Sequence, residues 1–273
     1  GLRDKYGDER RTQLLNLTSE TKEEKEIEFV EPENCVVVLT ESGLVKRVPS
    51  TSFRTQKRNG VGVKTQDDIT QAIIRTNTID ALMIFTDKGN MYRLLVNDIP
   101  VGNNTAKGQS IKSLVTMEAN ETPSVIYSVY RDTDAQYVLF TTKNGLVKKT
   151  PLAEYLKTKK KSGIKAIEIN EDDELISVSL LKDEQLILIT GNGYSIRFNS
   201  TEIPISSRTA MGVKGITLNE NDYVATAVII RNNTDNLAIF SAEGLAKKTE
   251  LKDYPVQKRA GKGLVCYKPT DTT

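Results

Sequence analysis

The apolar and polar positions of this chain form one pattern that occurs five times. Each copy has an apolar run rich in β-branched residues, a short turn that contains glycine, and a second run in which apolar and polar residues alternate. This order is typical of a β-hairpin. The turn glycines are spaced by 46, 56, 48 and 51 residues, and they are Gly43, Gly89, Gly145, Gly193 and Gly244. The pattern predicts hairpins at 36–49, 82–95, 137–150, 186–199 and 237–250.

A second glycine follows each turn glycine by 18 or 19 residues, and these are Gly62, Gly108, Gly163, Gly212 and Gly263. Two more apolar stretches, separated by an acidic turn, come after it, as in 163–181 and 212–230. Each repeat of about 50 residues therefore supplies about four strands, which is the size of one propeller blade. No long segment has helical periodicity. We expect an all-β ring of four-stranded blades, with about five blades and six as the alternative.

The repeats also suggest where the domain begins. We expect residues 1–33 to be a lead-in, with the end of a helix from an upstream domain at 1–15 and a polar linker after it. A ring must hide its closing edge, so Glu26–Val30 is a candidate strand for that role, with a solvated linker as the alternative. The blades are expected within 34–273, at 34–78, 79–133, 134–183, 184–233 and 234–273.

Composition excludes most catalytic machinery. The chain has no histidine, which rules out Ser-His-Asp and Cys-His nucleophiles and HExxH zinc sites. Its two cysteines, Cys35 and Cys266, are expected to be packed thiols rather than a disulfide. The doubled aspartates Asp67–Asp68 and Asp172–Asp173 lie at acidic turns and are expected to serve those turns rather than a metal. We expect no catalytic residue, metal or cofactor in this chain, and the missing histidine makes a propeller hydrolase improbable.

The charge is spread unevenly along the chain. The formal net charge is +2, but residues 1–33 hold ten acidic and six basic residues, so the remainder is more basic than the total suggests. This asymmetry indicates a polyanion as a partner. No apolar run approaches the length of a membrane span, and the N-terminus has no apolar signal segment. We therefore expect a soluble cytoplasmic protein that does not bind membranes.

The basic residues are phased to the repeat. Four residues after every turn glycine stands a lysine or arginine, and in three copies the residue before it is basic too; these positions are Lys46, Arg47, Arg93, Lys148, Lys149, Arg197, Lys247 and Lys248. The loop before the second glycine adds further cations, with candidates at Arg54, Lys57, Arg58, Lys107, Lys159, Lys160, Arg208, Lys258, Arg259 and Lys262. Because blades are related by rotation, we expect these charges to form a curved band.

A curved basic band suits duplex DNA, which carries one phosphate charge per about 1.7 Å of helix axis. Contacts to phosphates carry little sequence information, so the expected mode is wrapping without strong sequence preference. The alternative from another class is a propeller that binds a protein or peptide on its face, with the rim lysines serving solubility alone.

Two segments resemble a known family. Residues 56–62, QKRNGVG, and 257–263, QKRAGKG, are similar to the gyrase box, Q-[RK]-R-G-G-[KR]-G, of the C-terminal domain of type IIA topoisomerase A subunits. The segments 5–12 and 207–218 also resemble parts of that family. The resemblance covers essentially the whole chain. It completes the DNA-binding set with Gln56, Gly60, Gly62, Lys214 and Gln257.

The resemblance implies a β-pinwheel, a propeller-like disc whose blades exchange strands and whose basic rim wraps DNA. In DNA gyrase this wrap presents a DNA segment for ATP-dependent strand passage and negative supercoiling; in topoisomerase IV, the alternative, the domain bends DNA for decatenation and relaxation. It also implies that ATP and Mg are used elsewhere in an A2B2 enzyme. Contacts with the ATPase B subunit or with the second A subunit would go only through that assembly, and the domain would itself be a monomer.

The chain departs from the family pattern in its first box. Asn59 replaces a glycine and Val61 replaces a basic residue, so one phosphate contact is expected to be lost while Gly60 and Gly62 keep the turn. The sequence also stops about ten residues after the second box, where gyrase A would continue into a sixth repeat. The gyrase assignment is favoured on the similarity of the repeats and the retained Gln-Lys-Arg.

Overall fold

The computed structural model describes residues 30–53, 68–129, 134–158, 162–232, 234, 236–242 and 244–268. The chain divides into two compact units, residues 1–31 and 32–273. The expected lead-in helix lies outside the described residues, and so does the expected linker apart from residues 30–33. So does the proposed closing strand, except for Val30, which belongs to no strand.

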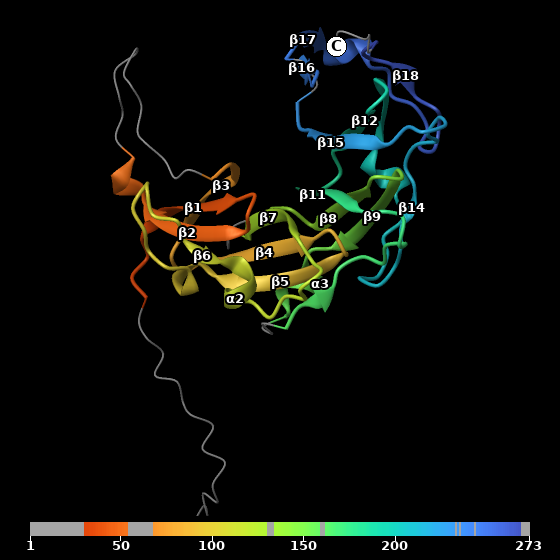
Figure 1. The fold of residues 1–273 in the computed structure, drawn as a ribbon. Helices are drawn as coiled ribbons and strands as arrows, with labels where there is room; N and C mark the ends of the chain where they lie inside the picture. Colours follow the sequence, from red (N-terminus) through yellow and green to blue (C-terminus); the bar gives the residue numbers. More distant parts are fainter. Residues whose placement is uncertain are drawn as a thin grey trace, which may run out of the picture. The chain divides into compact units, whose positions relative to one another are not determined.

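The described residues of the second unit form four antiparallel sheets of four strands and one further hairpin (Figure 1). In sheet order, the first consists of β3 (Thr70–Asn77), β1 (Asn34–Thr40), β2 (Leu44–Pro49) and β6 (Gln109–Ser110). The second consists of β7 (Pro123–Val129), β4 (Ala81–Thr86), β5 (Asn90–Leu95) and β10 (Ile164–Lys165). The third consists of β11 (Leu175–Leu181), β8 (Tyr137–Thr142), β9 (Leu146–Pro151) and β14 (Val213–Lys214). The fourth consists of β15 (Val224–Ile230), β12 (Gln185–Thr190), β13 (Tyr194–Asn199) and β18 (Leu264–Val265).

The remaining elements are short. The hairpin of the fifth repeat is β16 (Asn236–Phe240) with β17 (Ala246–Glu250). Helical turns follow the hairpins, and they are η1 (Ser50–Ser52), η2 (Val96–Asp98), α3 (Ala153–Leu156), η3 (Ser200–Glu202) and η4 (Leu251–Asp253), with α2 (Ile111–Leu114) after β6. The all-β class and the five hairpins predicted from the repeat are therefore confirmed.

Strand exchange joins each sheet to the next repeat. The fourth strand of every sheet is a two-residue segment that follows the next repeat's hairpin, as where Leu44 and Val45 of β2 pair with Ser110 and Gln109 of β6. The same arrangement joins β10 to β5, β14 to β9 and β18 to β13. This is the exchange that the resemblance implied.

The second glycine of the repeat makes the exchange possible. Gly108 precedes β6 with φ +86°, and a Cβ there would lie 2.6 Å from the carbonyl oxygen of Val45. Gly212 and Gly263 likewise have positive φ and would bring a Cβ within 2.7 Å of Val147 O and 2.5 Å of Ser195 O. A side chain at these positions would separate the exchanged strand from its sheet, which explains the constant offset of this glycine.

The core lies between consecutive repeats. Each of four clusters of buried apolar side chains draws on two neighbouring repeats, as where Phe85 packs edge-on against Phe140 with ring centroids 5.4 Å apart. The strands β3, β7, β11 and β15 contact one another in that order. The Tyr127 hydroxyl, for example, donates to the carbonyl oxygen of Val178 at 2.6 Å. A repeat therefore cannot bury its apolar face alone.

The cysteines and an acidic turn are as expected. Cys35 and Cys266 are buried free thiols, and burial raises the pKa of both. Asp173 accepts hydrogen bonds from the backbone N–H groups of Asn144 and Glu174, both at 2.9 Å, so it holds the end of a hairpin. Asp67 lies outside the described residues.

Candidate nucleic-acid interface

Several of the predicted basic residues lie inside the sheets. Lys46, Lys148, Lys149 and Arg197 are no more than 7% exposed. Sequence reasoning placed all four on an exposed band. The strand exchange buries them instead, because it lays the main chain of the next repeat over their side chains. A cation held in this way is not positioned to reach a phosphate, although DNA contact by any of the predicted residues stays a prediction.

Lys46 and Lys148 clamp the loop that leads into the exchanged strand. The Lys46 ammonium donates to the carbonyl oxygens of Asn104 and Ala106, at 2.7 and 2.8 Å. The Lys148 ammonium donates to those of Arg208 and Ala166, both at 2.5 Å. Burial lowers the pKa of both lysines, to about 7 for Lys148, where the nearby Arg208 charge acts in the same direction.

Lys149 and Arg197 reach the helical turn of the next repeat. Lys149 donates to the carbonyl oxygen of Ser200 at 2.8 Å, and burial lowers its pKa. Arg197 donates from Nη1 to the carbonyl oxygens of Leu251 and Tyr254, at 2.8 and 3.2 Å. The cations of β9 and β13 therefore hold consecutive repeats together.

We call the segments 100–108, 204–212 and 255–263 the exchange loops, because they lead into β6, β14 and β18. The loop at 255–263 contains the second box and shows how its residues divide. Arg259 is half-buried; its backbone N–H donates to Glu202 Oε2 at 2.9 Å, and its guanidinium donates to the carbonyl oxygens of Glu202 and Lys214. Ala260 has φ +68°, the left-handed conformation that explains a glycine at this position of the box. Lys258 and Lys262 are exposed. One cation of the box therefore holds the loop, and two face solvent.

The other predicted residues fall into three groups. Lys107, Lys214, Lys247 and Lys248 are exposed, and the ammonium of Lys247 donates to the carbonyl oxygen of Cys266 at 3.0 Å. Half-buried residues are Arg47, Arg93, Arg208 and Gln257. Outside the described residues lie Arg54, Gln56, Lys57, Arg58, Gly60, Gly62, Lys159 and Lys160. The exposed cations thus come from the exchange loops and strands and from β17.

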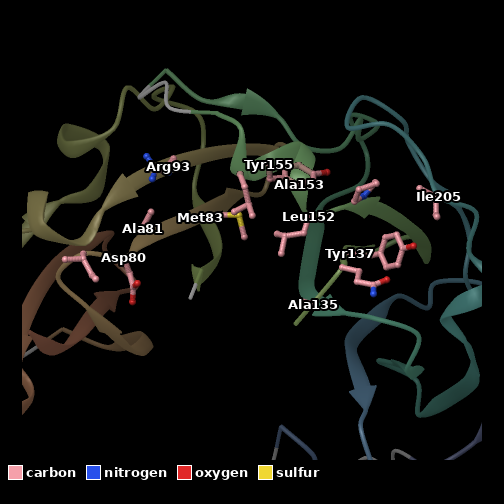
Figure 2. A pocket seen from close by; sticks show the side chains of 14 residues that line it. Asp80, Ala81, Met83, Arg93, Ala135, Tyr137, Leu152, Ala153, Tyr155 and Ile205 are labelled. Atoms are coloured by element: carbon pink, nitrogen blue, oxygen red, sulfur yellow. The ribbon is translucent and has the colours of Figure 1, made fainter. Parts of the chain in front are cut away.

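A groove of about 690 Å³ lies between the second and third repeats. Figure 2 shows Met83, Leu152 and Tyr155 in its middle, with Arg93 and Ile205 toward opposite ends of the view. Arg93 occupies the position that Lys149 and Arg197 hold in their repeats, but it lines this groove. Within the described ranges, no three carboxylate or thiol side chains gather where they could hold a metal ion. No helix in the described part of the chain is long and apolar enough to cross a membrane.

Comparison with known families accounts for these repeats. The model of the DNA gyrase C-terminal domain, a β-propeller family, matches residues 36–70, 80–121, 136–182, 184–231 and 235–269. The chain belongs to this family. The suspected resemblance is therefore confirmed, and each matched segment contains one of the five predicted hairpins.

Relatives and solved structures agree with the assignment. The chain is 34% identical to the DNA gyrase A protein of Mycobacterium bovis over 96% of its length and 36% identical to that of Clostridium acetobutylicum over 100%. It spans about a third of the length of these relatives, 32% and 33%. A crystal structure of the C-terminal domain of DNA topoisomerase IV is 30% identical, with TM-score 0.72, covering 87% of this chain and 73% of that one. A DNA gyrase A C-terminal domain is 26% identical, with TM-score 0.69, covering 88% and 80%.

In this gyrase-family domain, sequence reasoning missed the inward role of half the strand cations. The hairpin sequences already indicated that these cations do not all share one face, because neighbouring residues of a strand point to opposite faces. Lys46 and Arg47, or Lys148 and Lys149, are neighbours and cannot both extend from one face. Which face the next repeat covers depends on the strand exchange, and that was not encoded locally.

Proposed function

We propose that residues 32–273 bind duplex DNA and bend it along the exchange loops, as the DNA-wrapping part of a gyrase-type topoisomerase A subunit. The observation that carries this proposal is the recurrence of exposed lysines on the exchange loops and strands of a gyrase-family domain, namely Lys107, Lys214, Lys258 and Lys262.

The buried cations support the exposed ones. Lys46 fixes the main chain of the loop that presents Lys107, and Arg259 holds the loop that presents Lys258 and Lys262. A loop held by several main-chain hydrogen bonds loses little further entropy when it binds. Contacts between such fixed ammonium groups and phosphates release counterions and offset the cost of bending the duplex.

Strand passage as a whole belongs to a longer protein, such as the DNA gyrase A relatives. In that setting this domain is non-catalytic, and strand cleavage, ATP and Mg belong to other parts of the enzyme. The upstream region connects the domain to the A-subunit dimer and, through it, to the ATPase B subunit. We place this activity in the bacterial cytoplasm, on nucleoid DNA, because the relatives are bacterial gyrase proteins. A topoisomerase IV role, bending DNA for decatenation, is the second candidate, favoured by the structural similarity to that enzyme's domain.

Binding to a duplex of about 100 bp across a salt titration tests the proposal. We expect affinity to fall steeply with salt, with a log–log slope of about −0.9 per neutralised phosphate. Replacing Lys258 and Lys262 together by glutamine should make the slope shallower by about 2. Lys143→Gln with Lys182→Gln is the control, because it removes the same charge from two partly exposed lysines outside the exchange loops, which form ion pairs with Glu174 and Asp134.

Two outcomes would contradict the proposal. One is an absence of binding at low salt. The other is an equal loss in the two double variants, which would mean that the exchange loops have no special part in binding.

A further inference from the structure

One apolar residue stands at the same place in each exchange loop, seven positions before the second glycine. Val101, Ile205 and Val256 occupy this place, and they are 62%, 56% and 47% exposed. Each directly follows a proline, at Pro100, Pro204 and Pro255. Single exposed apolar residues are ordinary on protein surfaces, but this one recurs in phase with the fold.

The main chain holds each of these side chains in place. Val101, Ile205 and Val256 form isolated parallel bridges with Arg47, Lys149 and Arg197. Around Val101, the N–H of Arg47 donates to Pro100 O at 3.0 Å and the N–H of Gly102 donates to Arg47 O at 2.9 Å. Ser206 and Gln257 donate in the same way to Lys149 O and Arg197 O, at 2.9 and 2.7 Å. The apolar group cannot withdraw from solvent without breaking this bridge.

The backbone alone does not explain the residue type. An extended residue in a bridge favours β-branching, which threonine supplies without exposing an apolar surface. Valine and isoleucine at all three bridged positions therefore point to a contact made outside this chain. Leu156 shares the spacing to Gly163 and is 47% exposed, but it ends α3 and forms no such bridge.

The neighbouring charges identify the partner. Lys107 lies on the loop of Val101, and Lys258 and Lys262 lie on the loop of Val256, all exposed. Lys214 is exposed on the strand that follows the loop of Ile205. A rigid apolar projection flanked by cations fits a polyanion that has an apolar interior within reach of a side chain. Duplex DNA is such a partner, because its base steps can be parted from the minor groove by Ile, Leu, Met, Phe or Pro.

We propose that the bridged Pro-Val and Pro-Ile pairs of the exchange loops press into the minor groove of bound duplex DNA and part base steps, so that bending is concentrated at these points. This inference rests on the proposed DNA binding. In addition to the phosphate contacts made by the lysines, it proposes a contact with the bases. Flexible pyrimidine–purine steps are the easiest to unstack, so the bound DNA should take a register that places them at the loops.

The test uses a triple variant, Val101→Thr, Ile205→Thr and Val256→Thr, which keeps β-branching and every charge. Ile73→Thr is the matched control, because Ile73 is 67% exposed on β3, outside the exchange loops. Circular dichroism and melting temperature establish that each variant is folded. Energy transfer between dyes on the ends of a duplex reports bending, and 2-aminopurine placed at TA steps reports unstacking.

We expect the triple variant to lose about half of the bend and most of the 2-aminopurine signal. Its salt slope should be unchanged, because the phosphate contacts remain. The Ile73→Thr control should behave as the wild type. If the wild type does not bind DNA at all, the proposed function fails. If the wild type binds and bends DNA but the triple variant bends it equally, the inference that these pairs part base steps is overturned and the proposed function stands. The same holds if the triple variant differs from the wild type only in losing self-association.

Discussion

At the residue scale, the basic side chains of this domain have two different functions. Lys148 is completely buried, and its amine faces two carbonyl oxygens and the ring of Phe140, 5.0 Å from the ring centroid. A neutral amine has two hydrogens and can satisfy both carbonyls, so losing the proton does not break the clamp. Lys258, by contrast, is exposed to solvent on its exchange loop.

The burial of Lys148 predicts a pH dependence of stability. Its pKa is about 7 in the folded chain, against 10.5 for a free lysine, so the unfolded chain binds more protons between these values. The free energy of unfolding should therefore rise with pH from about 7 upward, by up to ~1.4 kcal/mol per pH unit from this group. Below pH 7 Lys148 is protonated in both the folded and the unfolded chain, so it adds no pH dependence to the free energy of unfolding.

Urea unfolding at several pH values from about 7 to 9 measures this effect. The Lys148→Met variant should not show this rise. The free energy of unfolding of the wild type, minus that of the variant, should therefore increase with pH. Lys143→Met changes a partly exposed lysine and should give a curve parallel to the wild type. Parallel curves for Lys148→Met as well would show that Lys148 keeps its proton throughout.

At the scale of the element, the exchanged strand is the weakest and most informative part of each sheet. With only two residues, β6 forms few ladder bonds of its own. It is held by Lys46, by the bridge at Arg47 and by the close approach at Gly108. The second glycine is thus a packing requirement in this sheet, whereas a Cβ at the turn glycine Gly43 would meet nothing within 4 Å. The turn glycine of the second repeat differs, because a Cβ at Gly89 would collide with Ile167 O.

Two alanine substitutions in the first sheet separate these roles. Gly43 has φ +79°, and a Cβ at this position would have nothing within 4 Å, so Gly43→Ala should cost only the left-handed strain, about 1–2 kcal/mol. Gly108→Ala adds a collision with Val45 O and should cost about 2 kcal/mol more. Urea unfolding gives the costs, and hydrogen exchange along β2 shows whether β6 has separated. Equal costs would mean that β6 adjusts freely.

At the scale of the whole molecule, the shared clusters make consecutive repeats depend on one another. Each four-stranded sheet takes a strand from the next repeat and packs against that repeat, so the loops and strands that present Lys107, Lys214 and Lys258 are positioned by two repeats at once. DNA that contacts several such loops is expected to follow a path with a fixed hand.

Religation of nicked plasmid in the presence of this chain tests the hand of that path. A linking-number shift of one sign that grows with protein concentration is expected for a gyrase-like wrap, because a fixed hand stores writhe in the closed circle. An unchanged topoisomer distribution would instead favour the topoisomerase IV reading, in which bending is weaker. The Lys258→Gln, Lys262→Gln variant, which should bind DNA less tightly, should give a smaller shift at the same concentration.

The sequence by itself determined the repeat, the five hairpins, the two glycine positions and the phasing of the cations. These follow from local physics, because alternation and turn glycines act within a few residues of each other. The residues of the box, Gln257 to Gly263, were also recognisable from sequence. The alternation within β2 and β9 further required that Lys46 and Arg47, or Lys148 and Lys149, point to opposite faces.

Only the tertiary structure decided which of these cations face solvent. Both acceptors of Lys46, and the Arg208 acceptor of Lys148, lie 58 to 60 residues ahead in the chain, in a loop that arrives only when the next repeat gives up its strand. The exposure of Val101, Ile205 and Val256 depends on the same event, because the bridge that fixes them joins two repeats. Burial is a property of the assembled sheets, and a pattern read within one repeat does not contain it.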